Sequence, residues 1–303
     1  DILKKLGGGI EIVGKIEGIP SGSGLGASNI LGATLIKALY ELTGRKIDDN
    51  ELIRKAISLE HRLDSYGGWQ DPVGGAVGGI KWITAEPGNP IPSFRMANIS
   101  LETLSRLESR MVLYYAGKPR VSPYILGQII TGYLLRQEPY YSAMLKAQAI
   151  RDGMLKALED GDVDRFGALS GEYWQTMVKR LGEQASNEII DRVFSETEGL
   201  IEGGRVSGSG GGGLLFLIAK EGKTQELKER LNEISRVTKG RTYAFAFDRR
   251  GITITKKNAA SPQVPAKLLP SSPATEGEPA AADTAAGVFK SAAAKTKVCF
   301  VGV

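Results

Sequence analysis

The amino-acid sequence predicts a fold of mixed helices and strands, and three observations support this class. Residues 9–16 alternate apolar and polar side chains as a half-buried strand does, and residues 30–42 repeat apolar side chains at helical spacing. Residues 123–181 are also predicted to be rich in helix, and residues 187–201 to form another helix. Finally, a glycine-rich stretch at residues 204–213 runs into an apolar strand at residues 214–218.

The first predicted strand and helix are joined by another glycine-rich stretch. Glycines let the backbone approach a ligand closely, and the N–H groups at a helix start attract an anion. We therefore predict a phosphate-binding loop, although a tight turn without a ligand would contain the same glycines. No Lys-Ser or Lys-Thr follows the loop, so the Walker pattern is absent. The predicted phosphate-binding residues are Ser21, Gly22, Ser23, Gly24, Leu25, Gly26, Ala27 and Ser28.

Two side chains are candidates for holding a cation. Ser28 stands at the entrance of the first helix, where the hydroxyl of such loops commonly reaches Mg²⁺, and its alternative role is an N-cap. Glu60 belongs to the next predicted helix, and its carboxylate falls on or beside the apolar face. A carboxylate turned inward needs a partner, which is either a cation or an arginine such as Arg54 or Arg62.

A third carboxylate, Asp71, lies between two pairs of glycines. The glycines let the backbone pack closely around it. We predict a catalytic carboxylate at the start of a short helix. With Pro72 at the first helical position, Asp71 would also be an N-cap, and the two roles are compatible. The segment reads Gly67-Gly68-Trp69-Gln70-Asp71-Pro72-Val73-Gly74-Gly75.

The remaining elements are predicted in order along the chain. Asp48 and Glu51 have the spacing of a capping box at the start of the second helix, and Gly44 stands where the first helix would end. Apolar strands are expected at 78–84 and 110–116, a helix at 224–237, and two strands within 242–255. Arg120, in the loop after the second of these strands, is either a phosphate ligand or a solvated arginine.

The amino-acid composition excludes several kinds of site and argues against several kinds of binding partner. The 303 residues include one cysteine, Cys299, and one histidine, His61, which excludes disulfides and clustered cysteine or histidine metal sites. The net charge of +5 comes from interspersed charges without a basic stripe, so nucleic-acid binding is unsupported. No membrane span or signal peptide is expected, and we predict a cytoplasmic protein. Because the chain opens with Asp1 almost directly in a strand, we expect an N-terminally truncated fragment.

Taken together, these motifs resemble those of the GHMP family of small-molecule kinases, and within it the L-fucokinase branch. The similarity covers roughly residues 8 to 257. It is carried by the motifs Pro20-Ser21-Gly22-Ser23-Gly24-Leu25-Gly26-Ala27-Ser28, Gly67-Gly68-Trp69-Gln70-Asp71, Val73-Gly74-Gly75, Gly117-Lys118-Pro119-Arg120 and Ser207-Gly208-Ser209-Gly210-Gly211-Gly212-Gly213.

The resemblance implies a two-domain α+β kinase with its active site between the halves. It divides the chain into an incomplete ATP-binding domain at 1–108 (ribosomal protein S5 domain 2-like), a ferredoxin-like domain at 109–257, and an Ala/Pro-rich disordered tail at 258–303. The first loop would bind ATP, Ser28 and Glu60 would bind Mg²⁺, and Asp71 would face the sugar hydroxyl. The substrate and phosphate side would include Gly68, Trp69, Arg120, Gly208, Ser209, Gly210 and Gly211.

The function implied is ATP-dependent phosphorylation of the anomeric hydroxyl of L-fucose. A related kinase acting on a heptose phosphate, or a nucleotide-binding module without catalysis, is the alternative. The chain departs from the family pattern at Asn29, Pro72 and Ser209. The family's first motif, a strand and loop that helps to form the sugar pocket, is also missing, and the activity of a fragment without it is left open.

Overall fold

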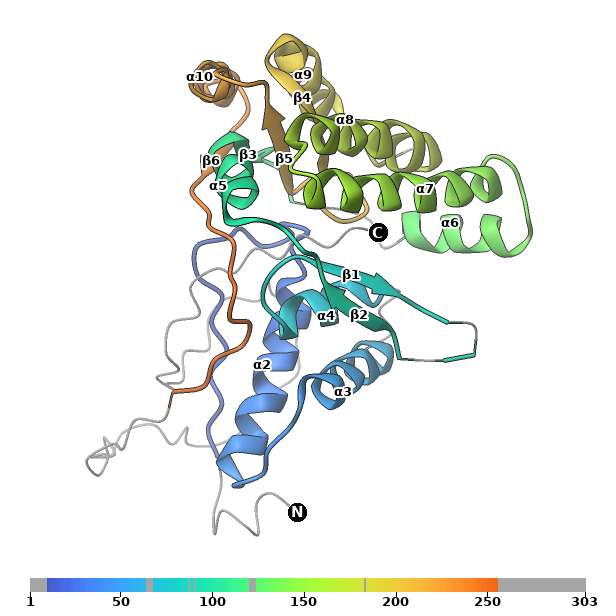
Figure 1. Ribbon diagram of the computed structural model, residues 1–303, viewed down its shortest axis with the longest axis vertical. Coiled ribbons are helices and arrows are strands. Elements are labelled where there is room, and N and C mark those ends of the chain that lie inside the picture. The colour runs from blue at the N-terminus through green and yellow to red at the C-terminus, as the bar shows by residue number, and fades with distance from the viewer. Residues whose placement is uncertain are drawn as a thin grey trace, which may run out of the picture.

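The chain folds into two halves (Figure 1). Each half is built around its own cluster of buried hydrophobic side chains. The computed structural model describes residues 10–63, 68–86, 88–89, 91–119, 124–182 and 184–255, and the predicted tail, Cys299 and Arg120 lie outside this range. The N-terminal half contains α2 (Ala27–Leu42), α3 (Asp49–Arg62), α4 (Gln70–Ala76) and the antiparallel pair β1 (Lys81–Thr84) and β2 (Ser93–Met96).

The C-terminal half is built on a four-stranded antiparallel sheet in the order β4-β5-β3-β6. Along the chain, β3 is followed by a group of helices, then by β4 and β5, then by α10, and finally by β6. This order confirms the predicted ferredoxin-like arrangement. The elements are α5 (Leu101–Arg110), β3 (Met111–Tyr115), α6 (Tyr124–Leu134), α7 (Tyr140–Glu159), α8 (Val163–Tyr173), the π-helix η1 (Trp174–Lys179), α9 (Glu188–Thr197), the 3₁₀ turn η2 (Glu198–Leu200), β4 (Ile201–Val206), β5 (Leu214–Ala219), α10 (Thr224–Ser235) and β6 (Arg241–Tyr243).

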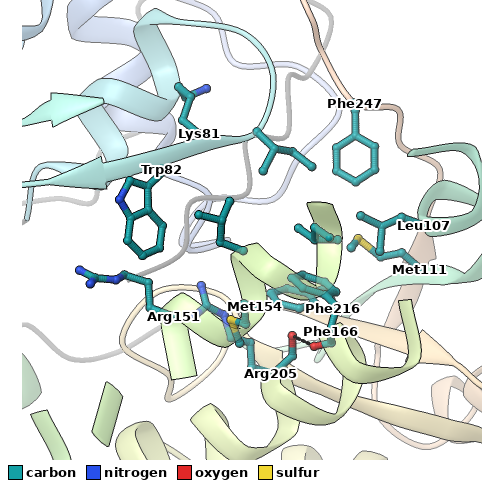
Figure 2. A pocket seen from close by; sticks show the side chains of 14 residues that line it. Lys81, Trp82, Leu107, Met111, Arg151, Met154, Phe166, Arg205, Phe216 and Phe247 are labelled. Carbon is teal, nitrogen blue, oxygen red and sulfur yellow. Dashed lines mark hydrogen bonds between the residues drawn. The ribbon is translucent and has the colours of Figure 1, made fainter. Parts of the chain in front are cut away.

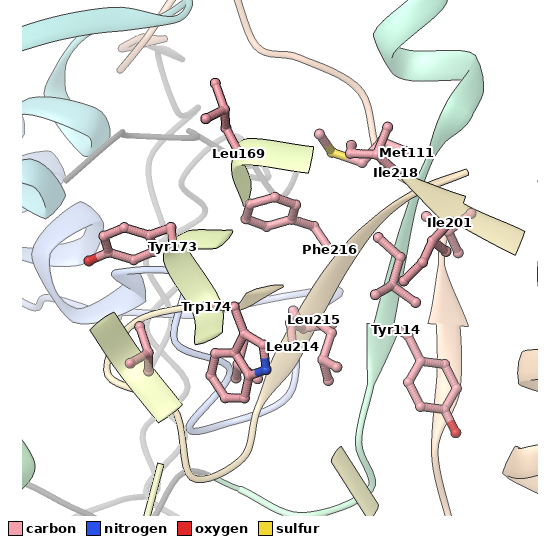
Figure 3. Packing of buried hydrophobic residues seen from close by; sticks show 14 of the residues in the cluster. Met111, Tyr114, Leu169, Tyr173, Trp174, Ile201, Leu214, Leu215, Phe216 and Ile218 are labelled. Carbon is pink, nitrogen blue, oxygen red and sulfur yellow. The ribbon is translucent and has the colours of Figure 1, made fainter. Parts of the chain in front are cut away.

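Strand β5 is the centre of the larger core. All six of its residues are buried, as its uninterrupted apolar sequence predicts for a strand covered on both faces. Figure 3 shows side chains of β5 packed among Trp174 of η1, Leu169 of α8 and Tyr114 of β3. The sheet is therefore a rigid support for the loops at its ends, including the second glycine-rich stretch between β4 and β5.

The predicted ends of the first two helices are confirmed. Asp48 accepts a hydrogen bond from the Glu51 amide at 2.8 Å and caps α3. Gly44 has a φ angle of +70° and ends α2 one residue after the C-cap Thr43. None of the helices in the described part of the chain combines the length and apolar character needed to cross a bilayer.

Two predicted strands are wrong. Residues 10–16 form no ladder, and Ile12 and Ile16 are about half exposed at 51% and 49%. An alternating sequence makes a strand only when a neighbouring strand accepts its hydrogen bonds, and no described strand lies beside this segment. Two strands are expected within residues 242–255, and only the first of them forms. It is β6 (Arg241–Tyr243), which pairs with β3.

Residues 244–255, which we call the C-terminal strap, run from the sheet to the N-terminal half (Figure 1). The Phe247 amide donates to the Glu108 carboxylate at 2.8 Å, and the Asp248 carbonyl accepts from Gly79 at 2.6 Å. Ile252 then enters the N-terminal core, and its carbonyl accepts a hydrogen bond from Lys37 at 3.0 Å. The strap thus ties the halves together, while the domain boundaries at 108 and 257 stay predictions.

Candidate active site

The two glycine-rich stretches, nearly 200 residues apart in sequence, lie against each other. The Leu214 amide donates to the Ser23 carbonyl at 2.9 Å. A Cβ atom added to Gly24 would lie 2.6 Å from the carbonyl oxygen of Ser207, and one added to Gly213 would lie 2.6 Å from that of Ser23. The backbones approach so closely because neither glycine carries a side chain.

The second stretch also packs on backbone from its own half. A Cβ at Gly210 would lie 2.6 Å from the Ala185 carbonyl oxygen, and one at Gly212 would lie 2.7 Å from that of Pro119. The Gly213 amide donates to Lys118 at 2.9 Å. The close backbone approach predicted for these glycines is therefore confirmed, and at these contacts their partner is the backbone of the same protein.

The first stretch ends at the N-terminus of α2. Gly26 is the N-cap residue, with a φ angle of +64° and no side-chain capping bond. Ser28 is the second residue of the helix and is exposed, so the alternative N-cap role for Ser28 is wrong. The amides of the first turn have no partner within the helix, which makes this end of α2 suited to an anion. Leu25 packs on the C-terminal core and anchors the loop.

The carboxylate of Asp71 lies directly against this helix start. A Cβ at Gly26 would lie 2.9 Å from Cγ and 3.1 Å from Oδ1 of Asp71. Trp69 is the N-cap of α4, which makes Asp71 the second residue of that helix and Pro72 the third. The predicted capping role of Asp71 is therefore wrong, and the predicted position of the carboxylate at the start of a short helix is confirmed.

Glu60 lies two residues before the end of α3, half-buried. Its carboxylate forms no ion pair or hydrogen bond with any residue in the described ranges, and Arg54 instead approaches Glu51 at 3.8 Å. A Cβ at Gly32, one turn beyond Ser28, would lie 2.9 Å from Leu59, so α2 and α3 pack closely there. The packing brings Glu60 and Ser28 to the same end of the helix pair.

A pocket of about 60 Å³ opens between the two halves (Figure 2). Trp82 of β1 and Arg151 of α7 form one side, with the guanidinium 4.3 Å from the centroid of the Trp82 indole, and Phe247 of the strap lies opposite. The lining residues are Ile80, Lys81, Trp82, Leu107, Met111, Arg151, Met154, Leu155, Leu158, Phe166, Ser170, Arg205, Phe216 and Phe247.

Arg205 lines this pocket, although none of the sequence motifs indicated it. It lines the pocket from β4, two residues before Ser207. Burial lowers the pKa of its guanidinium, and the nearby Tyr173 and Asp71 oppose that shift. The one feature of the sequence that could have indicated Arg205 is its charge, because it is a single arginine among glycines and apolar residues close to Ser207.

The other predicted site residues are spread over the two glycine-rich stretches and the start of α4. Ser21 and Gly22 are exposed, Ser23 is buried, and Gly68 and Trp69 are exposed beside Asp71. In the second stretch Gly208 is exposed and Gly211 donates to the Ala185 carbonyl. The Ser209 hydroxyl is buried, and no group in the described part of the chain hydrogen-bonds to it.

This fold and these motifs define a family of small-molecule kinases. Residues 1–79 match the GHMP kinases N terminal domain and residues 154–235 match GHMP kinases C terminal, together more than half of the chain. The chain belongs to the GHMP kinase family, as its motifs predict.

Among its relatives is the bifunctional fucokinase/GDP-fucose pyrophosphorylase of Arabidopsis thaliana, 31% identical over 71% of this chain and 20% of that protein. The chain therefore spans about a fifth of the length of this relative. It is also 28% identical to the D-glycero-alpha-D-manno-heptose 7-phosphate kinase of Campylobacter jejuni, over 77% of this chain and 67% of that protein. A crystal structure of mevalonate kinase superposes with a TM-score of 0.59 at 20% identity, covering 77% of this chain and 67% of the other, and shares the fold.

Proposed function

We propose that this protein transfers the γ-phosphoryl group of ATP to the anomeric hydroxyl of L-fucose, giving L-fucose 1-phosphate. The observation that carries the proposal is the Asp71 carboxylate held against Gly26, at the helix start where phosphates would bind. A donor site and a carboxylate are thereby adjacent, and phosphoryl transfer needs this combination. The fucokinase relative supports L-fucose as the acceptor.

The residues around the first loop suit ATP and Mg²⁺. The amides at the start of α2 would hold phosphate oxygens, and the hydroxyl of Ser28 and the carboxylate of Glu60 are hard oxygen donors. Mg²⁺ usually takes only one or two protein ligands beside phosphate oxygens and water, so this donor set is sufficient. When bound, Mg²⁺ would neutralise charge on the transferring phosphoryl group.

Asp71 would act on the acceptor. Its carboxylate would orient the sugar hydroxyl and take up the proton that leaves as the new oxygen–phosphorus bond forms. The pocket between the halves, with the indole face of Trp82 and the rings of Phe216 and Phe247, would exclude water from the acceptor side.

A second acceptor class has an observation in its favour. Arg151 and Arg205 both line the pocket, and paired guanidinium groups suit a phosphorylated sugar better than a neutral one. The similarity to a heptose-phosphate kinase, over two thirds of that protein, agrees with this.

Labelled ATP distinguishes these acceptors. We expect the purified protein to transfer label from [γ-³²P]ATP to L-fucose, and not to D-glucose as a control sugar. Transfer of label only to a heptose phosphate would contradict L-fucose as the acceptor and would identify a phosphorylated sugar as the acceptor instead. ATP binding without transfer to any sugar would contradict the kinase and favour a nucleotide-binding module.

We expect Glu60→Gln and Ser28→Ala to weaken binding of Mg²⁺–ATP by about tenfold or more, because residues that merely support a metal ligand already contribute about 10- to 100-fold. Binding of ATP in the presence of EDTA should change little. Isothermal titration calorimetry measures both affinities, and Glu51→Gln, at the other end of α3, is the matched control. An equal loss of ATP affinity with and without Mg²⁺ would show that neither Glu60 nor Ser28 binds the metal ion.

A further inference from the structure

Lys81, the first residue of β1, is a buried lysine that binds the turn preceding its own strand. It is only 4% exposed. Its Nζ donates hydrogen bonds to the carbonyl oxygens of Val77 at 2.6 Å, Gly78 at 3.3 Å and Gly79 at 2.6 Å. A buried ammonium group is costly unless its hydrogens are satisfied, and three carbonyls match the three hydrogens that it carries. We call these four residues the Lys81 clamp.

Helix α4, which ends at this turn, is poorly suited to stand alone. It has only seven residues, and they include Pro72 and the pair Gly74-Gly75. Short helices are marginal in water, and proline and glycine favour a helix least. Gly75 packs on α2, where an added Cβ would lie 2.8 Å from Cγ1 of Ile30. The position of α4 therefore depends on contacts with other elements, at its side and at its ends.

A continuous series of hydrogen bonds joins Lys81 to the start of α4. Val77, whose carbonyl accepts from Lys81, is the C-cap residue of α4, and its amide donates to the Val73 carbonyl at 3.2 Å. The Val73 amide donates in turn to the carbonyl of the N-cap Trp69 at 3.1 Å, two residues before Asp71. Hydrogen bonds in series strengthen one another, and a cation at the C-terminal end favours the helix dipole. The ammonium group thus supports α4 from the end opposite to Asp71.

The C-terminal strap meets the same turn. The Gly79 amide donates to the Asp248 carbonyl at 2.6 Å, and the Ile252 amide donates to the Ala76 carbonyl at 3.3 Å. Lys81 also borders the pocket between the two halves (Figure 2). The end of α4 is therefore fixed by Lys81 from β1 and by the strap, which comes from the C-terminal sheet.

We propose that Lys81 is a positioning residue, which fixes α4 through the carbonyls at its C-terminal end and thereby holds Asp71 against Gly26 at the start of α2. The inference rests on the proposed function for the catalytic role of Asp71. The order of α4 can be measured without turnover, so the inference and the proposed function can fail separately.

Arg110 provides a matched control in the C-terminal half. It is also buried, at 6% exposure, and its Nε donates to the Ala219 carbonyl at 2.8 Å. Replacing either cation by methionine removes a hydrogen bond from a charged group to a buried carbonyl, so both variants should have a lower melting temperature. Arg110 lies at the end of α5, whereas Lys81 holds the turn after α4. Lys81→Met should therefore loosen α4, and Arg110→Met should not.

The experiment compares hydrogen–deuterium exchange of backbone amides in the whole chain, well below the melting temperature of each variant. In Lys81→Met the α4 amides, including those of Val73 and Val77, should exchange about 10- to 100-fold faster, the equilibrium equivalent of one hydrogen bond to a charged group. Peptides from the C-terminal sheet should exchange as in wild type. In Arg110→Met the α4 amides should keep their wild-type rates.

Turnover is the second readout. Lys81→Met should lower kcat for phosphoryl transfer by about 10- to 100-fold, because misplacing a reacting group by about 1 Å can cost about 100-fold. The KM for ATP should stay near wild type, since the start of α2 is untouched. Arg110→Met should leave kcat of the folded fraction unchanged. Lys81→Arg keeps a cation with N–H donors, so it should retain more protection of α4 and more activity than Lys81→Met.

The two readouts separate the inference from the proposed function. Unchanged exchange of α4 in Lys81→Met contradicts the positioning role, and so does an equal acceleration in α4 and the C-terminal sheet, which a merely structural lysine would give. Faster exchange confined to α4 with a wild-type kcat also contradicts it. The same local change in a protein whose wild type transfers no phosphate supports the clamp and rejects the kinase. If Lys81→Met does not fold, Lys81→Gln, which keeps an N–H donor, gives the same measurements.

Discussion

Asp71→Asn is expected to lower phosphoryl transfer by about 100- to 10,000-fold, the usual contribution of a positioned acid–base group. Asparagine has nearly the same shape as aspartate but cannot accept the proton of the acceptor hydroxyl. Because Asp71 lies within the first turn of α4 rather than at its N-cap, the fold should tolerate the change. ATP affinity should also remain near wild type, since the loop and the start of α2 are untouched.

The measurement is single-turnover transfer from labelled ATP, with calorimetry for ATP binding and urea denaturation for stability. Asp48→Asn is the matched control, because Asp48 caps α3 and asparagine caps a helix about as well as aspartate. It should leave rate and stability unchanged. A transfer rate close to wild type in Asp71→Asn would exclude Asp71 from the mechanism.

Gly24→Ala is expected to separate the two glycine-rich stretches and to lower the free energy of unfolding by about 2–5 kcal/mol. The φ angle of +79° at Gly24 disfavours any side chain, at about 1–2 kcal/mol. The added methyl group would also lie 2.6 Å from the Ser207 carbonyl oxygen, and such overpacking costs about 1–3 kcal/mol. ATP affinity should fall as well, since the loop would no longer rest on β5.

Gly44→Ala isolates the first of these two effects. Gly44 has a similar φ angle of +70°, but within the described part of the chain no atom outside its immediate neighbours lies within 4 Å of its added Cβ. Urea denaturation should therefore show a smaller loss, of about 1–2 kcal/mol, in this control. Equal losses in the two variants would show that the contact between Gly24 and Ser207 contributes nothing to stability.

The sequence by itself predicted the elements whose signals are local. The periodicity of residues 30–42 and the glycine at residue 44 defined α2, and the capping pair of Asp48 and Glu51 defined the start of α3. The apolar run of β5 predicted a fully buried strand. Helix periodicity and caps are reliable signals because they depend on neighbours within a few residues, and an uninterrupted apolar run of this length is typical of a strand covered on both faces.

The ordered motifs also predicted the family, and with it the two-part α+β fold. They did not predict which strands would pair. Residues 10–16 have the alternation of a strand, but a strand is completed by hydrogen bonds from another segment, and local sequence says nothing about whether that segment is adjacent. The same reason explains the strap, whose contacts with Glu108 and Ala76 come from distant parts of the chain.

Only the tertiary structure decided how the candidate site is assembled. Asp71, the first glycine-rich stretch and the second come from segments up to about 190 residues apart, and their contacts depend on close backbone approach rather than on any sequence pattern. The sequence shows Arg205 only as a single arginine before the second glycine-rich stretch, because the two aromatic rings that hold its guanidinium come from other elements of the fold. Such contacts are set by the packing of the two halves, since charge and shape complementarity between remote segments exist only once the chain has folded.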